Sequence, residues 1–242
     1  MTDAMNQDGR PGRPDAFWGF EDLALFLGAL LPAFAGGMAL VRMGRTLAPK
    51  TFASEAVQAL VFQASIYAVL LGALYLLLVV RHGRPLWRSL GWTMRFRGAW
   101  WYLGASPLLA LTISAMGVLL HAPNVPTPVE SLVNSRGSLV AVMLFAAFAG
   151  PVFEELVFRG FLYPLLAESL GAWPGIGLAA LAFGVLHGPE YQWSWQHVLL
   201  VTGAGVAFGC ARYWTGSTAA AALMHIGYNT TLVVVYLIQL KG

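Results

Sequence analysis

The chain has 242 residues, of which 58% are hydrophobic and only 10% are charged, and its mean hydropathy is +0.66. A water-soluble domain carries roughly 25% charged residues to solvate its surface, so this composition excludes a soluble protein and predicts that most of the surface faces lipid. The formal net charge of +3 comes from arginines that flank apolar runs, which favours lipid headgroups over nucleic acid as partners. The single cysteine, Cys210, excludes an intrachain disulfide and a cysteine-based zinc site.

A polar, glycine- and proline-containing segment is followed by seven apolar runs. We expect residues 1–17 to form a disordered tail, and residues 18–242 to form an all-α polytopic membrane protein, a single bundle of seven to eight transmembrane helices. The runs cover residues 23–43, 52–80, 100–120, 138–170, 174–187, 195–213 and 217–240. At about 20 residues per span, little chain remains for a soluble catalytic domain, so any chemistry must take place among the helices or on short loops.

Arginines and tryptophans are interleaved from the end of the second run to the start of the third, at Arg81, Arg84, Trp87, Arg88, Trp92, Arg95, Arg97, Trp100 and Trp101. This pattern is typical of the interface between membrane and water, and the positive-inside rule places this loop in the cytoplasm. Only two of the fourteen basic residues are lysines, which favours a bacterial origin. We therefore expect a multi-pass protein of a bacterial inner (plasma) membrane.

Three charged residues interrupt the fourth run: Glu154, Glu155 and Arg159. A charge at the centre of a bilayer costs about 2.5 to 3.5 kcal/mol, so each needs a partner or a function. Glu155 and Arg159 are four residues apart with the acid first, which predicts an ion pair on one helix face. Glu154 points about 100° away, so it needs a proton, a metal or a group from another helix, and it is the candidate general base.

Two histidines, His187 and His225, lie within apolar runs. If the chain turns at Gly171, Glu154 and His187 are both about 25 Å from that turn, at 1.5 Å per residue. His225 lies about 14 Å beyond a second turn expected near residue 216, and Asn229 follows it on the same helix face. These polar groups are predicted to converge in the middle of the membrane.

The polar residues form three motifs. They are EExxxR (Glu154, Glu155, Arg159), FxxxH (Phe183, His187) and HxxxN (His225, Asn229). In this order, on successive apolar helices, they resemble the CPBP intramembrane protease family, also called the CAAX protease and bacteriocin-processing, or Abi, family. The resemblance covers residues 138–240, the expected catalytic core, and the family includes endopeptidases that cleave prenylated CAAX proteins.

The resemblance implies a role for each motif residue. Glu154 would be the catalytic acid and base, and His187 would help it to bind and activate water. His225 and Asn229 would bind a metal ion or polarise the scissile carbonyl. Around them, Glu155 is expected close to the site with Arg159 as its structural partner, and Phe183 is expected to pack against it. The implied substrate is a membrane-anchored protein or peptide, in some members a prenylated one.

Two hydrolytic mechanisms fit these residues. Glu154, His187 and His225 match a His₂Glu zinc site with one position open for water, in keeping with the description of the family as metalloproteases. Alternatively, Glu154 assisted by His187 takes a proton from water directly, while His225 and Asn229 stabilise the oxyanion. The sequence lacks HExxH, GxSxG and GxGD, the motifs of zincins and of serine or paired-aspartate proteases. A divalent metal, most simply zinc, is one of two open alternatives.

Two functions of other classes compete with proteolysis. Glutamate and histidine chains within membranes also serve as proton relays, so a proton-coupled transporter is one alternative. A transporter, however, predicts polar residues along a path through most of the membrane, whereas these residues concentrate in one layer. The other alternative is a non-catalytic scaffold, such as a bacteriocin-immunity protein, although the presence of every polar motif residue argues against it.

Overall fold

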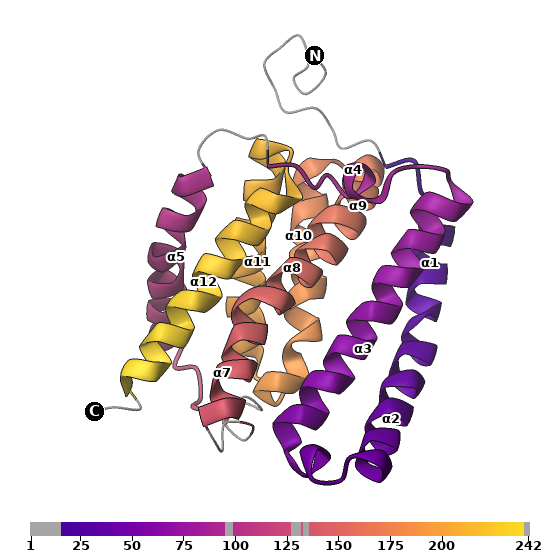
Figure 1. The fold of residues 1–242 in the computed structure, drawn as a ribbon. Coiled ribbons are helices and arrows are strands. Elements are labelled where there is room, and N and C mark those ends of the chain that lie inside the picture. The colour runs from indigo at the N-terminus through magenta and orange to yellow at the C-terminus, as the bar shows by residue number, and fades with distance from the viewer. Residues whose placement is uncertain (1–15, 95–98, 127–131, 133–135, 240–242) are drawn as a thin grey trace. The chain divides into compact units, whose positions relative to one another are not determined.

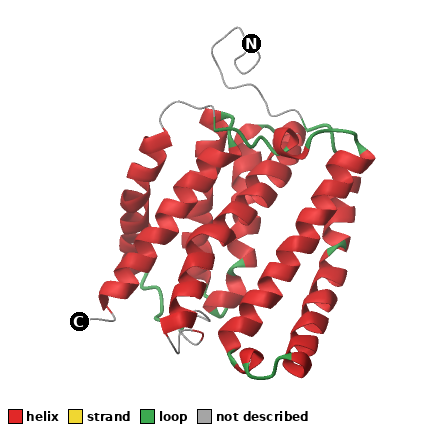
Figure 2. Cartoon of the chain, viewed as in Figure 1, coloured by secondary structure: helices red, strands yellow, loops and turns green. Residues whose placement is uncertain are grey.

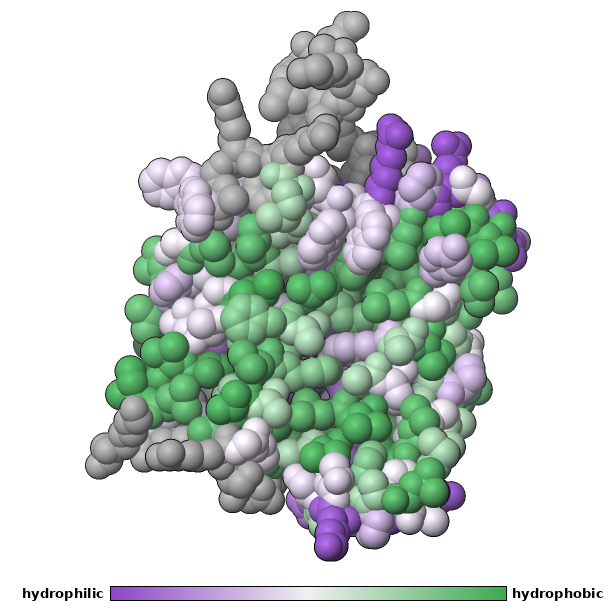
Figure 3. Space-filling view, in the orientation of Figure 1, coloured by the Kyte–Doolittle hydropathy of each residue, from purple (hydrophilic) through white to green (hydrophobic). Residues whose placement is uncertain are grey.

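The computed structural model describes residues 16–94, 99–126, 132 and 136–239, and this part of the chain is helical without strands (Figures 1 and 2). Within it, six helical segments are long and apolar enough to cross a membrane: Phe20–Leu47, Glu55–Arg81, Trp100–Leu119, Gly137–Leu170, Trp195–Thr215 and Thr218–Gln239. Apolar side chains dominate the face drawn in Figure 3. The chain is therefore a polytopic helical membrane protein, as its composition predicts. The expected disordered tail lies almost wholly outside the described residues.

One expected span is shorter than the others. The run at residues 174–187 forms helix α10 (Ala172–Leu186), which has 15 residues. At 1.5 Å per residue it is about 22 Å long, which is less than the roughly 30 Å of hydrocarbon in a typical bilayer. The seven predicted runs thus correspond to six candidate spans and one short apolar helix.

The chain divides into two compact units, one of which comprises residues 17–89 and 128–145. Its helices are α1 (Phe20–Gly28), α2 (Leu30–Leu47), the 3₁₀ turn η1 (Thr51–Ala53), α3 (Glu55–Tyr75), the π-helical η2 (Leu76–Arg81), α4 (Leu86–Ser89) and α7 (Arg136–Leu144). The buried carboxylate of Asp22 joins two of them. It accepts a hydrogen bond from the Gly19 amide and lies 3.2 Å from Arg81 Nε and 3.0 Å from His82 Nε2. These contacts fix the start of α1 to the end of η2.

The other unit includes residues 90–127 and 146–242 and contains every motif residue. Its helices are α5 (Ala99–Leu119), α8 (Gly150–Glu155), the π-helical η4 (Leu156–Leu162), α9 (Tyr163–Leu170), α10, the 3₁₀ turn η5 (Gly188–Tyr191), α11 (Trp195–Thr215) and α12 (Thr218–Gln239). A π-helical segment, η3 (Phe145–Ala149), leads into α8. Both expected turns form at glycines with positive φ, 92° at Gly171 and 65° at Gly216, a conformation that side chains with a Cβ disfavour.

The segment that precedes α5 binds the start of α12. The amide of Thr218 donates to Gly91 O over 3.0 Å, and its hydroxyl donates to Leu90 O over 2.5 Å. Ser217 Oγ donates to Thr93 O as well. Side chains at and just before the start of α12 therefore hold a segment that is more than 120 residues away in the sequence.

Small residues allow α10 and α11 to approach closely. A Cβ added at Gly184 on α10 would lie 2.1 Å from Thr202 Oγ1 and 2.7 Å from Val198 O on α11. Such close approach at small residues is the usual mode of helix packing in membranes. The α10–α11 pair thus depends on Gly184.

We predict that Gly184→Ala destabilises the protein by about 1–3 kcal/mol, because the added methyl group overpacks the helix contact. Gly177→Ala is the matched control, since a Cβ there meets nothing within 4 Å. Alanine is favoured over glycine within a helix by about 1 kcal/mol, so the control should be neutral or stabilising. Unfolding in detergent, followed by circular dichroism, gives both values, and equal stabilities for the two variants would contradict this account.

Candidate active site

Helix α8 carries both glutamates and lies between two π-helical segments, η3 and η4. π-Helical turns are rare and often occur at functional sites. The two side chains differ in environment: Glu155 is 0% exposed, whereas the side chain of Glu154 is 21% exposed. Neighbouring positions on a helix point about 100° apart, so one carboxylate enters the protein interior while the other remains accessible.

Glu155 and Arg159 form the predicted ion pair. Arg159 Nη1 donates to Glu155 Oε1 over 2.9 Å, and both side chains are at most 1% exposed. Arg159 Nη2 donates to the backbone carbonyl of Gly205 on α11 over 2.7 Å. The guanidinium also lies 4.9 Å from the ring centroid of Phe183 and 5.5 Å from that of Phe208, within the range of cation–π attraction. The buried charge of Arg159 is thus satisfied on several sides.

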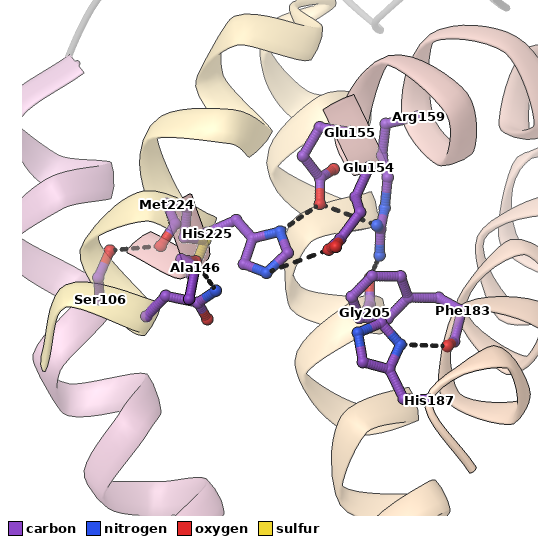
Figure 4. A network of polar contacts seen from close by, with 11 residues as sticks. Ser106, Ala146, Glu154, Glu155, Arg159, Phe183, His187, Gly205, Met224 and His225 are labelled. Atoms are coloured by element: carbon purple, nitrogen blue, oxygen red, sulfur yellow. Dashed lines mark hydrogen bonds and ion pairs between the residues drawn. The ribbon is translucent and has the colours of Figure 1, made fainter. Parts of the chain in front are cut away.

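His225 on α12 bridges the two glutamates (Figure 4). Its Nδ1 lies 3.0 Å from Glu155 Oε1, and its Nε2 lies 3.8 Å from Glu154 Oε2. The shorter contact is a hydrogen bond, whereas 3.8 Å is too long for one. His225 is therefore a neighbour of Glu154 from another helix, one of the three kinds of partner that the sequence predicts for this glutamate.

His187 is the C-cap residue of α10 and is oriented by its own helix. Its Nδ1 lies 2.8 Å from the carbonyl oxygen of Phe183, one turn earlier. Because a carbonyl oxygen can only accept, Nδ1 carries a proton, and in the neutral imidazole Nε2 then keeps a lone pair. The Phe183 ring lies 4.4 Å from the His187 ring and 5.6 Å from the His225 ring, so Phe183 contacts residues of two motifs.

Asn229 lies one turn beyond His225 and binds the backbone of another helix. Its Nδ2 donates to the carbonyl of Ala146 in η3 over 2.8 Å. Sequence reasoning did not find Ser106 on α5, whose hydroxyl contacts the backbone of α12. Ser106 Oγ lies 2.9 Å from the carbonyl of Met224, next to His225. A lone serine in an apolar helix gives little indication of such a role.

The turn after His187 contributes a second residue that sequence reasoning missed. Gln192 and Trp193 both have positive φ, 50° and 60°, which is strained for residues with a side chain. Partial burial of its carboxyl group raises the pKa of Glu190 in this turn, although the residue as a whole is exposed. A positive charge on His187 would oppose this rise, and the negative charge of Glu154 adds to it. Glu190 therefore lies within electrostatic reach of two motif residues.

The donor chemistry of Glu154, His187 and His225 suits zinc. Each histidine has its Nδ1 held by an oxygen acceptor, which leaves Nε2 for a ligand, as in many zinc sites. Within the described part of the chain, however, no group of three His, Cys, Asp or Glu side chains is placed to hold a metal ion.

Comparison with known proteins identifies the region that holds these residues. Residues 136–231 match the family model described as "Type II CAAX prenyl endopeptidase Rce1-like", a range that includes all three motifs. No curated protein and no solved structure matches the chain. The family resemblance predicted from the motifs is thus confirmed over residues 136–231, the part of the chain that matches this family model.

Proposed function

We propose that this protein is an intramembrane endopeptidase that hydrolyses a peptide bond of a membrane-anchored protein or peptide. The main supporting observation is the pair of adjacent glutamates. Glu155 is buried and bonded to Arg159 and His225, whereas Glu154 is partly accessible and faces His225 Nε2. The description of the matched family supports prenylated, CAAX-like substrates, and the composition favours a bacterial plasma membrane.

Glu154 is the proposed general base. Its carboxylate takes a proton from a water molecule, and the resulting hydroxide attacks the carbon of the scissile carbonyl. In the neutral form of His187, Nδ1 donates to Phe183 O and Nε2 is an acceptor, so Nε2 can accept the second hydrogen of the same water and orient the oxygen. Glu154 then gives its proton to the nitrogen of the leaving amine.

His225 and Asn229 are the proposed oxyanion stabilisers. A donor aimed at the developing charge in a water-poor site can be worth about 3–4 kcal/mol. Asn229 Nδ2 has two N–H groups and uses one on Ala146 O. His225 presents Nε2 to the same side as Glu154 and can donate from it when that atom is protonated. Glu155 holds the ring in this orientation through Nδ1.

This mechanism uses no metal ion. The alternative is a zinc ion bound by Glu154, His187 and His225 after the three side chains draw closer together. Bound zinc would supply Lewis-acid activation of the water. The two mechanisms assign the same residues and differ in their response to a chelator.

We predict that Glu154→Gln abolishes cleavage of a membrane-anchored peptide, because an amide cannot take a proton from water. The purified wild type and the variant are compared in liposomes, on a peptide library with and without a prenyl group. Glu168→Gln is the matched control, since Glu168 is an exposed glutamate on α9 and should retain full activity. If cleavage by Glu154→Gln equals that of the wild type, Glu154 is not the base. A folded wild type that binds these peptides without cutting them would favour a scaffold.

A chelator separates the two mechanisms. Direct activation of water by Glu154 predicts that cleavage by the wild type is unchanged after incubation with EDTA or 1,10-phenanthroline. Loss of cleavage that added zinc restores would instead support the metal-bound alternative. Metal analysis of the dialysed protein provides a readout that does not depend on the choice of substrate.

We predict that Arg159→Met alone, or Glu155→Gln alone, destabilises the fold by about 3–5 kcal/mol, because each leaves an uncompensated group in a buried site. The double variant removes both charges and should regain much of this loss. Thermal unfolding in detergent measures all three proteins. Activity should stay low in the double variant, because His225 loses its carboxylate partner. If the double variant loses as much stability as the two single variants together, the two residues are not coupled and the ion-pair explanation is wrong.

A further inference from the structure

One face of α11 contacts the site at three positions, although the motifs assign this helix no role. Gly205, Phe208 and Arg212 are spaced three and four residues apart, so they share a face. The carbonyl of Gly205 accepts from Arg159 Nη2, and Arg212 Nε donates to the carbonyl of Arg159 over 3.2 Å. Phe208 lies between Gly205 and Arg212 on the helix, and its ring contacts His225.

The ring of Phe208 stacks on the imidazole of His225. The centroids are 4.4 Å apart and the planes are inclined by 20°. Phe208 is 0% exposed, and its ring is held by edge contacts with Phe183 at 6.4 Å and with Tyr228 at 5.8 Å. The phenyl face against His225 is therefore a fixed surface.

A hydrogen bond to Glu155 alone does not define where Nε2 of His225 points. The χ2 torsion of histidine is broad, because it joins an sp³ and an sp² carbon, and the bond at Nδ1 fixes only one edge of the ring. A flat surface at stacking distance fixes the plane of the ring as well. Glu155 and Phe208 together thus determine the position of Nε2.

We propose that Phe208 is a positioning residue for His225. It holds the imidazole plane so that Nε2 faces Glu154 and the reacting carbonyl, and it acts on the reaction only through His225. The effect of Phe208 on catalysis rests on the proposed function, whereas its contact with the imidazole of His225 is a property of the fold. Gly205 and Arg212 support the same arrangement by fixing Arg159, the partner of Glu155.

The test is Phe208→Leu, which keeps an apolar side chain and removes the flat face. A ring displaced by about 1 Å can cost about 100-fold in rate, so kcat should fall about 10- to 100-fold while KM changes less than about twofold. Phe208→Tyr keeps the face and should restore most of kcat. In ¹³C-histidine-labelled protein, the ring signals of His225, assigned with His225→Gln, should shift in the leucine variant because the aromatic ring current is lost.

Phe161→Leu is the control for lost packing. Phe161 is also 0% exposed, and within the described residues the aromatic neighbours of His225 are Phe183 and Phe208. This control should lose stability as Phe208→Leu does but keep kcat and the His225 signals. Equal losses of kcat in both variants, or unchanged His225 signals in Phe208→Leu, overturn the proposal. If no substrate is cleaved at all, shifted His225 signals still support the positioning contact, and the failure lies with the proposed function.

Discussion

The site depends on one buried ion pair in a protein surrounded by hydrocarbon. Moving a carboxylate and a guanidinium out of water is costly, and the cost is met only when geometry and additional hydrogen bonds are good. Here Glu155 Oε1 accepts from Arg159 and lies within hydrogen-bond distance of His225 Nδ1, while Arg159 also binds the carbonyl of Gly205. One oxygen atom therefore joins η4 and α12, and the same guanidinium joins α11. Few positions of these helices satisfy all of these contacts.

The two adjacent glutamates lie in different surroundings, so the buried ion pair supports a second carboxylate that remains accessible. The helix directs Glu155 into the protein, where its charge is compensated, and directs Glu154 toward His225 and a partly accessible space. A charged group needs a fixed structure around it before it can be placed with precision in a medium that disfavours charge. Glu155, Arg159 and the aromatic rings around them form that fixed structure. Glu154 is not part of it and can remain accessible.

The sequence was sufficient to predict the helical membrane fold, the turns at Gly171 and Gly216, the Glu155–Arg159 pair and the family. Each of these follows from local spacing or from the cost of charge in lipid. Ser106 and Phe208 could not be predicted, because a serine or phenylalanine in an apolar run has the same local pattern whether or not it contacts a distant histidine. The π-helical segments have no recognisable local pattern either. The closer partner of His225 was also missed: spacing along one helix pairs Glu155 with Arg159 but cannot indicate a contact 70 residues away.

The length of helix α10 differs from the thickness of a bilayer. At 15 residues it is about 8 Å shorter than the hydrocarbon layer, and such hydrophobic mismatch is relieved when the bilayer thins or when flanking polar residues lie at the level of the acyl chains. His187 ends this helix, and Glu190 and Gln192 follow it directly. Either adjustment would draw the hydrated boundary inward beside His187. For the proposed hydrolysis, the length of one helix would then bring water, the second reactant, to a depth from which lipid otherwise excludes it.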